Sequence, residues 1–307
     1  MISFVIPCYK SALTIGQVVA EIKETIVNEE FEIVLVNDAS PDNTFDVIRE
    51  LCNNNNNVIG INLNRNFGQH AALMAGFHQV KGDIIVCLDD DGQTPANEVD
   101  KLIDAIHQGH DAVYAKYAQK RHSGFRNFGS HLNELMARFL LEKPKKLYLS
   151  SYFAVRRFVV DEMIKYENPY PYVIGLLLRT TKDIVNVDVC HREREIGQSG
   201  YTFNKLIALW LNGFTAFSVK PLRVATSAGF LAALVGFVYG IVTIIRKLLG
   251  LNYVLGFSGL MSALLFLGGL NLIMLGLIGE YIGRIYISLN KSPQFIVREI
   301  VNGGEER

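Results

Sequence analysis

The chain has 307 residues, of which half are apolar and a fifth are charged, and its 30 basic residues balance 30 acidic ones. This composition excludes a disordered chain, and the neutral balance excludes a nucleic-acid binder that depends on bulk positive charge. The mean hydropathy is above zero, which is high for a soluble protein. The four cysteines show no metal-ligand spacing, so we expect ordinary thiols in a reducing compartment.

Strand and helix patterns alternate five times over the first 115 residues. Ser11 is expected to cap the first helix. The alternation predicts a mostly parallel sheet with helices on both faces, which binds ligands beyond the carboxyl ends of its strands. Strands are predicted at 2–6, 31–36, 58–62, 83–88 and 111–115. Helices are predicted at 15–26, at 69–79 and at 96–108, and another helix follows the second strand and ends near residue 53.

The apolar residues concentrate near the end of the chain. Val224–Ile245 is a run of 22 residues without a charge, and Leu248–Gly279 is a run of 32. At ~1.5 Å per helical residue, either run can cross a hydrocarbon core of ~30 Å, so we predict two membrane helices. The alternative is a pair of buried core helices. A helix at 128–141 and an interfacial helix at 201–217 are also expected, and for the latter a core helix is the alternative.

Three consecutive aspartates, Asp89, Asp90 and Asp91, follow the predicted strand at 83–88. Alternate residues of an extended segment project to the same side, so Asp89 and Asp91 can share a site. Oxygen ligands suit Mg²⁺ or Mn²⁺, ions that commonly bridge carboxylates to substrate phosphates, and Gln93 could supply a further oxygen. The alternative is a solvated acidic turn.

Two other polar segments are candidate binding sites. Asp38 ends the second predicted strand and is expected to contact a nucleotide base or ribose, with a helix cap as the alternative. Arg192 and Arg194 lie in a charged segment next to the membrane-directed part of the chain. Arginine is a natural phosphate binder, although alternating charges also occur on solvated surfaces.

Five segments of the chain form a recognisable set when they are taken together in order. They are residues 36–42, 64–70, 88–93, 192–201 and 276–286. This set resembles family 2 glycosyltransferases that act on polyprenyl phosphate, and the resemblance covers nearly the whole chain. The group includes dolichol-phosphate-mannose synthases and bacterial undecaprenyl-phosphate sugar transferases.

The resemblance implies a GT-A fold, a divalent cation (Mg²⁺ or Mn²⁺), a nucleotide-sugar donor, an undecaprenyl phosphate acceptor and contact with membrane lipid. Many relatives are tetramers, so it also implies a homotetramer as a candidate assembly. Asp89, Asp91 and Arg194 are the expected catalytic residues. The implied contacts are Asp89, Asp91 and Gln93 for the metal, Pro7, Tyr9, Asp38, Arg65 and Asp90 for the nucleotide sugar, and Lys116, Arg126, Ser130 and Arg194 for the acceptor phosphate.

One departure from the family pattern concerns the catalytic base. A proposed base aspartate of the family aligns with Ser150, in a segment that reads Ser-Ser-Tyr-Phe. A phosphate monoester has a second pKa of ~6 and is already largely a dianion at pH 7. It needs no base to attack, so Ser150 is expected to be compatible with catalysis.

We therefore expect an inverting, metal-dependent glycosyltransferase that makes a polyprenyl-phosphate sugar at the bacterial inner membrane. A processive polysaccharide synthase and a non-catalytic, membrane-anchored nucleotide-sugar binder are the alternatives. The first residues do not read as a signal peptide, so the catalytic domain is expected to stay in the cytosol. The expected parts are a GT-A domain at 1–200, an interface helix at 201–220, a membrane hairpin at 221–290 and a cytosolic tail at 291–307.

Overall fold

The computed structural model describes residues 1–27, 29–92, 94–117, 144, 147–190, 220–249, 257–290 and 292–302. The chain divides into two compact units, one of residues 1–202 and 291–307 and the other of residues 203–290. The expected helix at 128–141 and the expected interfacial helix at 201–217 lie outside the described residues.

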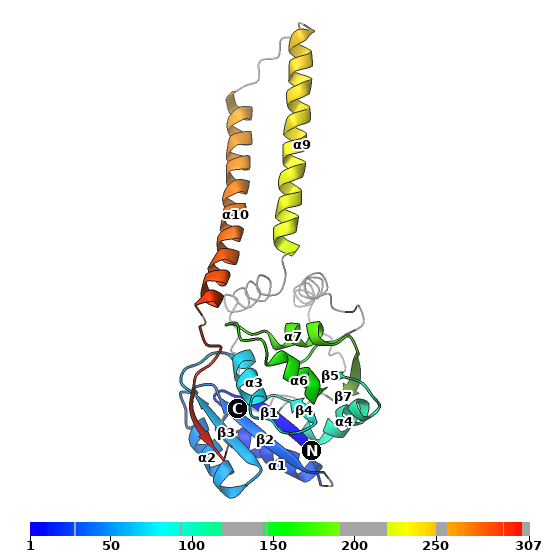
Figure 1. The fold of residues 1–307 in the computed structure, drawn as a ribbon, viewed down its shortest axis with the longest axis vertical. Helices are drawn as coiled ribbons and strands as arrows, with labels where there is room; N and C mark the ends of the chain where they lie inside the picture. Colours follow the sequence, from blue (N-terminus) through cyan, green and yellow to red (C-terminus); the bar gives the residue numbers. More distant parts are fainter. Residues whose placement is uncertain are drawn as a thin grey trace. The chain divides into compact units, whose positions relative to one another are not determined.

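The first unit contains a sheet with helices packed on it (Figure 1). Its elements are β1 (Ile2–Cys8), α1 (Ile15–Thr25), β2 (Phe31–Asn37), α2 (Thr44–Asn54), β3 (Val58–Leu63), α3 (Gln69–Phe77), β4 (Ile84–Cys87), the short 3-10 helix η1 (Ala96–Glu98), α4 (Val99–His107), β5 (Ala112–Tyr117), β6 (Phe153–Arg156), α6 (Arg157–Met163), α7 (Val173–Thr180), β7 (Ile184–Val189) and β8 (Val297–Val301).

The described strands form one eight-stranded sheet in the order β7-β5-β6-β4-β1-β2-β3-β8. β4, β1, β2 and β3 are parallel neighbours, as the alternating pattern predicted. β6 runs antiparallel between β4 and β5, and β8 runs antiparallel along β3. The sheet is therefore mixed, and β6, β7 and β8 are strands that the sequence analysis did not predict.

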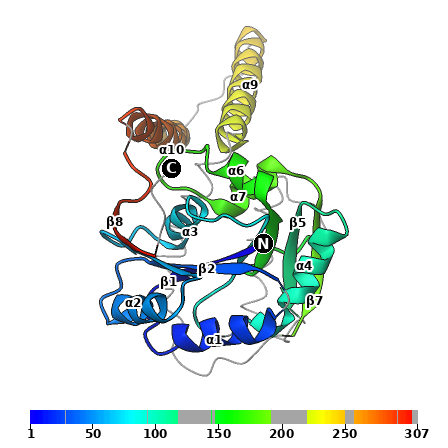
Figure 2. The same cartoon turned by 60° about the horizontal axis from the view of Figure 1, so that its bottom comes forward.

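Alternating side chains of the central strands supply two apolar layers. Figure 2 shows α1 and α2 on one face of the sheet and α3 and α6 on the other. Ile15 and Ile22 of α1 are fully buried with Phe4 and Ile6 of β1 in one core. On the opposite face α3 lies so close that a Cβ at Gly76 would meet Val5 Cγ1 at 2.4 Å. Glycine is thus required there by packing rather than by backbone conformation.

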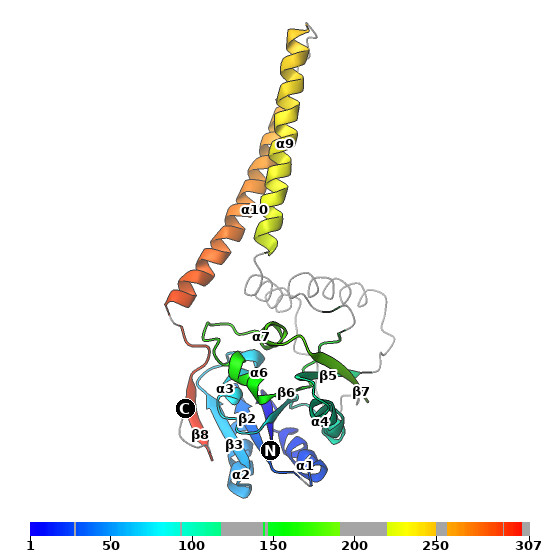
Figure 3. The same cartoon turned by 45° about the vertical axis from the view of Figure 1, so that its right-hand side comes forward.

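The C-terminal segment returns to the sheet, and β8 lies beside β3 (Figure 3). Arg49 of α2 forms a 2.8 Å ion pair with Glu299. The side-chain amide of Gln294 donates to the carbonyl oxygen of Asn168 at 2.9 Å. Residues 291–307 were expected to be a tail, and the structure shows that their described part includes an edge strand of the eight-stranded sheet.

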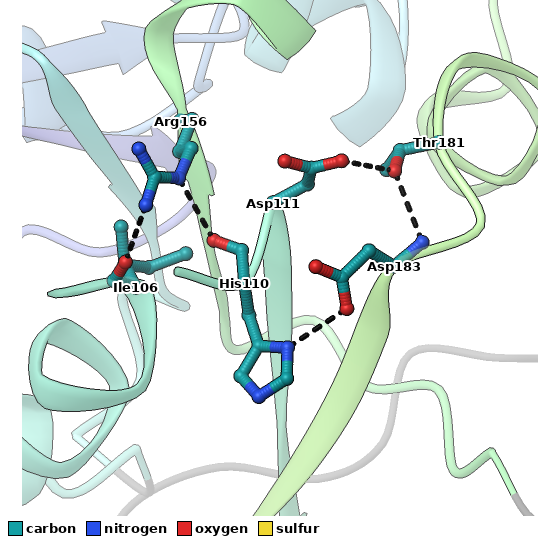
Figure 4. Close-up of polar contacts among 6 residues, drawn as sticks. All are labelled: Ile106, His110, Asp111, Arg156, Thr181 and Asp183. Carbon is teal, nitrogen blue, oxygen red and sulfur yellow. Dashed lines mark hydrogen bonds and ion pairs between the residues drawn. The ribbon is translucent and has the colours of Figure 1, made fainter. Parts of the chain in front are cut away.

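A polar cluster ties β6 and the start of β7 to the segment that leads into β5 (Figure 4). Arg156 donates to the carbonyl oxygens of Ile106 at 2.9 Å and His110 at 3.1 Å. The hydroxyl of Thr181 donates to Asp111, and Nδ1 of His110 lies 2.8 Å from Asp183 Oδ1. These contacts fix the far edge of the sheet, at the opposite end of the strands from the aspartate cluster described below.

The described part of the second unit consists of two long helices, α9 (Lys220–Leu248) and α10 (Phe257–Leu289). They approach each other where a Cβ at Gly229 would meet Met274 Cε at 3.2 Å. Among the described residues, one segment is long and apolar enough to cross a membrane, Leu267–Leu289, and Ala225–Val238 is a shorter apolar helical segment. Of the two expected membrane spans, the structure therefore supports the one in α10.

Candidate active site

The carboxyl ends of β1, β2 and β4 lie next to one another because the three strands are parallel. Cys8 at the end of β1 pairs with Asn37 at the end of β2, and Cys87 ends β4 opposite Val5. Asp38 and the aspartates at 89–91 follow directly, so the topology brings together residues that are about 50 positions apart. The sequence analysis placed both groups at the ends of strands in a mostly parallel sheet, and the structure agrees.

Asp89 is held by side chains from two other segments. The amide Nε2 of Gln69, the first residue of α3, donates to Oδ1 of Asp89 at 2.9 Å. The hydroxyl of Ser151, two residues before β6, donates to Oδ2. Each carboxylate oxygen therefore accepts a hydrogen bond from a neutral donor.

Asp90 turns instead toward the loop that follows β1. Its Oδ2 atom accepts a 2.9 Å hydrogen bond from the backbone N–H of Tyr9 and another from the hydroxyl of Ser11. Ser11 therefore does not cap α1, whose N-cap residue is Thr14. The prediction of a Ser11 cap was wrong because Asp90, which is remote in sequence, takes the hydroxyl.

The aspartate cluster is electrostatically suited to a cation. The pKa of Asp89 is raised to about 6, chiefly by burial and also by the nearby charges of Asp91 and Asp90, while the hydrogen bonds from Ser151 and Gln69 oppose the shift. Burial also raises the pKa of Asp90. Crowded carboxylates of this kind are stabilised when a positive ion lies among them. The described residues contain no group of three or more His, Cys, Asp or Glu side chains arranged as metal ligands, so a cation here would need further oxygens.

Asp38 organises the loop that leads into α3. Its two carboxylate oxygens accept backbone hydrogen bonds from Phe67 at 2.7 Å and Gly68 at 2.8 Å. Burial raises the pKa of Asp38, and these two bonds oppose the shift. Because Gly68 has φ +90° and ψ 159°, a conformation almost confined to glycine, its N–H can face Asp38 immediately before the helix begins.

The remaining described candidates surround this edge of the sheet. Pro7 lies within β1, and the half-exposed ring of Tyr9 follows it. The Arg65 guanidinium stacks over the Phe67 ring, 4.7 Å from its centroid. Lys116 Nζ pairs with Asp188 Oδ1 of β7 at 3.2 Å. The other four candidates, Gln93, Arg126, Ser130 and Arg194, lie outside the described residues.

Two models of known protein families match this chain. Residues 3–164 match the model of glycosyl transferase family 2, and residues 220–285 match the GtrB C-terminal hairpin. The chain belongs to glycosyl transferase family 2. The hairpin match covers most of α9 and α10, so both parts of this glycosyltransferase have counterparts in known families.

Curated relatives match this glycosyltransferase over nearly its full length. The undecaprenyl-phosphate 4-deoxy-4-formamido-L-arabinose transferase of Proteus mirabilis is 32% identical, covering 98% of this chain and 94% of the relative. The protein of the same name from Pectobacterium carotovorum is 33% identical over the same shares.

Solved structures confirm the GT-A fold. Glucosyl-3-phosphoglycerate synthase from Mycobacterium tuberculosis, in complex with Mn²⁺, UDP-glucose and phosphoglyceric acid, superimposes with a TM-score of 0.54 at 18% identity. The match covers 70% of this chain and 77% of that one.

Two adjacent serines of this glycosyltransferase play different parts. The Ser150 hydroxyl, at the position aligned with the family's proposed base, lies 2.8 Å from the carbonyl oxygens of both Ala115 and Tyr152. It faces the backbone at the end of the β5–β6 pair, whereas Ser151 reaches Asp89. The sequence analysis weighed Ser150 and missed Ser151 and Gln69. Gln69 lies in a segment that carried the resemblance, but only the folded chain shows that it contacts Asp89.

Proposed function

We propose that this glycosyltransferase moves a sugar from a nucleotide-sugar donor, a UDP-sugar, to undecaprenyl phosphate with inversion at the anomeric carbon. The product is a polyprenyl-phosphate sugar for modification of cell-envelope glycans. The observation that carries the proposal is the 32% identity over 98% of the chain to an undecaprenyl-phosphate sugar transferase. The sugar in that relative's name, 4-deoxy-4-formamido-L-arabinose, is the first donor sugar to test.

The aspartate cluster supports a donor site that contains Mg²⁺ or Mn²⁺. Asp89 and Asp91 would hold the cation through carboxylate oxygens, with Gln93 as a third candidate and the donor diphosphate as a source of further oxygens. When bound, the cation would supply positive charge that stabilises the diphosphate leaving group. A structural neighbour that binds Mn²⁺ with UDP-glucose shares this fold. Asp38, Tyr9, Pro7, Arg65 and Asp90 are proposed to shape the nucleoside part of the site.

The acceptor needs to be held rather than deprotonated. A phosphate oxygen of undecaprenyl phosphate, largely a dianion at pH 7, attacks the anomeric carbon directly. Cationic side chains lower its repulsion from the donor diphosphate, and we assign this to Arg126, Arg194 and Lys116, with Ser130 as a hydrogen-bonding residue. The orientation of Ser150 supports an attack without a base, because its hydroxyl faces backbone carbonyls.

We further propose that both α9 and α10 cross the bacterial inner membrane and that the catalytic unit and C-terminus are cytosolic. Large apolar side chains are exposed on both helices, including Phe230 and Phe237 on α9 and Leu272 on α10. Five basic residues lie near the start of α9 or near and after the end of α10, and two lie in the last turn of α9, in agreement with the positive-inside rule. These are Lys220, Arg223, Arg284, Lys291 and Arg298 against Arg246 and Lys247.

A cysteine-labelling experiment tests this topology. A cysteine placed near Gly250 should react with a membrane-impermeant reagent added outside the cell, and one placed after Val301 should not. Labelling of the C-terminal position alone would contradict the proposed orientation. We also propose that the full chain assembles as a homotetramer, and cross-linking in membranes tests this assembly.

The function is tested with the full chain in detergent, undecaprenyl phosphate and a panel of radiolabelled UDP- and GDP-sugars. We expect label from one UDP-sugar to enter an organic-soluble lipid that carries a single sugar, and Asp91→Asn to abolish it. Growth of a water-soluble polymer would indicate a processive synthase. Donor binding without transfer under any condition would indicate a non-catalytic binder.

A further inference from the structure

The carboxylate of Asp89 is fixed in orientation by donors from two separate parts of the fold. A carboxylate on its own rotates easily, because the terminal torsion of aspartate has a broad energy profile. Here Gln69 of α3 binds Oδ1 and Ser151, which precedes β6, binds Oδ2. One donor on each oxygen defines the plane of the group. Rotation of Asp89 would break both hydrogen bonds.

Both donors are anchored by their neighbours in the chain. Ser151 is followed by the fully buried Tyr152, whose hydroxyl donates to the Pro95 carbonyl at 3.3 Å. The backbone carbonyl of Tyr152 accepts a 3.0 Å hydrogen bond from the N–H of Ala115 in β5. Gln69 follows Gly68, whose N–H is bound to Asp38. The position of each donor is therefore set by packed parts of the sheet and loops.

The chemistry of the donors matters as much as their geometry. An amide and a hydroxyl carry no net charge, so they orient Asp89 without neutralising it. A carboxylate has about four lone-pair positions, of which these contacts use two. Lysine or arginine in either place would compete electrostatically with a metal ion. Neutral donors leave both the charge and the remaining lone pairs for a cation.

We propose that Ser151 and Gln69 are positioning residues that hold the Asp89 carboxylate in the orientation that binds the divalent cation. This inference rests on the proposed function, in which Asp89 is a metal ligand. Hydrogen-bonding partners of metal ligands typically contribute about 10–100-fold to metal affinity. Ser151 thus occupies the place next to the family's proposed base with a different role, because it acts through Asp89 and not on the acceptor.

The test measures Mn²⁺ binding directly. Mn²⁺ is titrated into the full chain in detergent with UDP present, and free Mn²⁺ is followed by electron paramagnetic resonance. Ser151→Ala and Gln69→Ala should each raise the dissociation constant for Mn²⁺ about 10-fold or more. Ser151→Thr keeps the hydroxyl that donates to Asp89, so it should bind Mn²⁺ within about two-fold of wild type. In turnover assays Ser151→Ala should need more Mn²⁺ but approach the wild-type kcat at saturation.

Ser150→Ala is the matched control, because it removes a neighbouring hydroxyl that binds only backbone carbonyls in the described structure. It should leave the Mn²⁺ dissociation constant unchanged. Wild-type affinity in both Ser151→Ala and Gln69→Ala would overturn the inference, and so would an equal loss in Ser150→Ala, which would indicate general loosening. A wild-type chain that transfers sugar but binds no Mn²⁺ would overturn it as well. If Mn²⁺ binding is weakened by Ser151→Ala but the wild-type chain transfers no sugar, only the proposed function is contradicted.

Discussion

The backbone N–H of Tyr9 donates a 2.9 Å hydrogen bond to Oδ2 of Asp90, 81 residues later in the chain. Ser11 binds the same oxygen, so Asp90 joins the loop after β1 to the loop after β4. Asp91, the next residue, is proposed to contact the cation. Adjacent aspartates are therefore expected to respond differently to mutation.

Asp90→Ala should lower the stability of the catalytic unit by about 1–3 kcal/mol, because it removes the acceptor of the Tyr9 N–H and of the partly buried Ser11 hydroxyl. Asp90→Asn keeps one acceptor oxygen and should cost less. Thermal unfolding of the full chain in detergent measures both. Equal losses for alanine and asparagine would show that the oxygen does not support the loop.

Asp91→Asn should nearly abolish turnover while the unfolding temperature stays close to that of wild type. Asparagine lacks the negative charge that the cation requires. A chelator should inhibit the wild-type enzyme in the same way, and added Mn²⁺ or Mg²⁺ should restore it. The measurement is lipid-linked product formed per minute. Full activity in excess chelator would show that turnover does not require a divalent cation.

Arg194→Ala should reduce turnover far more than Ser150→Ala. Loss of the arginine leaves acceptor charge uncompensated in a partly dry site, whereas loss of the serine hydroxyl should cost ~10-fold or less, near ~1 kcal/mol. The measurement is the rate at which each folded variant forms lipid-linked product. An inactive Ser150→Ala beside a nearly normal Arg194→Ala would refute a phosphate that is steered by arginine and attacks without a base.

His70 should make stability depend on pH. Its Nδ1 atom is buried and has no hydrogen-bond partner among the described residues, its ring packs edge-on against Tyr172 at 5.0 Å, and burial lowers its pKa to about 4. The unfolded chain binds a proton below about pH 6.5, and the native state does so only near pH 4. Stability from this group is therefore complete above pH 6.5 and decreases as the pH falls toward 4, by up to about 3 kcal/mol.

The His70 effect is isolated by comparison with His70→Gln, which does not titrate. As the pH is lowered from 6.5 to 4, the unfolding temperature of the wild type should fall more than that of His70→Gln. Other groups that titrate in this range, including Asp89, are common to both proteins. A difference that stays constant with pH would show that His70 is not protected from protonation.

Gly68→Ala should destabilise the protein by about 1–3 kcal/mol, because φ +90° with ψ 159° is almost confined to glycine. No atom lies within 4 Å of a Cβ added there, so the cost comes from the backbone and not from a clash. Gly16 in α1 also has open space where a Cβ would project, and Gly16→Ala should instead stabilise by about 0.5–1 kcal/mol. Thermal unfolding of the two variants should therefore shift in opposite directions.

The sequence by itself determined the parallel half of the sheet. The strand and helix periodicities of residues 2–117 are local properties, since a strand alternates every two residues and a helix repeats every 3.6. The observed β1 to β5 and α1 to α4 agree with the predicted segments to within a few residues. The gathering of Asp38 and Asp89 at one edge followed directly, because parallel strands end on the same side.

The tertiary structure decided the contacts that no local pattern carries. Val297–Val301 becomes a strand only because β3 offers it an open edge, and β6 is placed by pairing with both β4 and β5. The partners of the aspartates were likewise undetermined, because hydrogen bonding depends on which side chains the fold brings within about 3 Å. Ser11 was expected to cap a helix and binds Asp90 instead, and Ser151 rather than Ser150 reaches Asp89. Adjacent residues of an extended segment point to opposite sides, so the choice between two neighbouring serines required the register of the folded sheet.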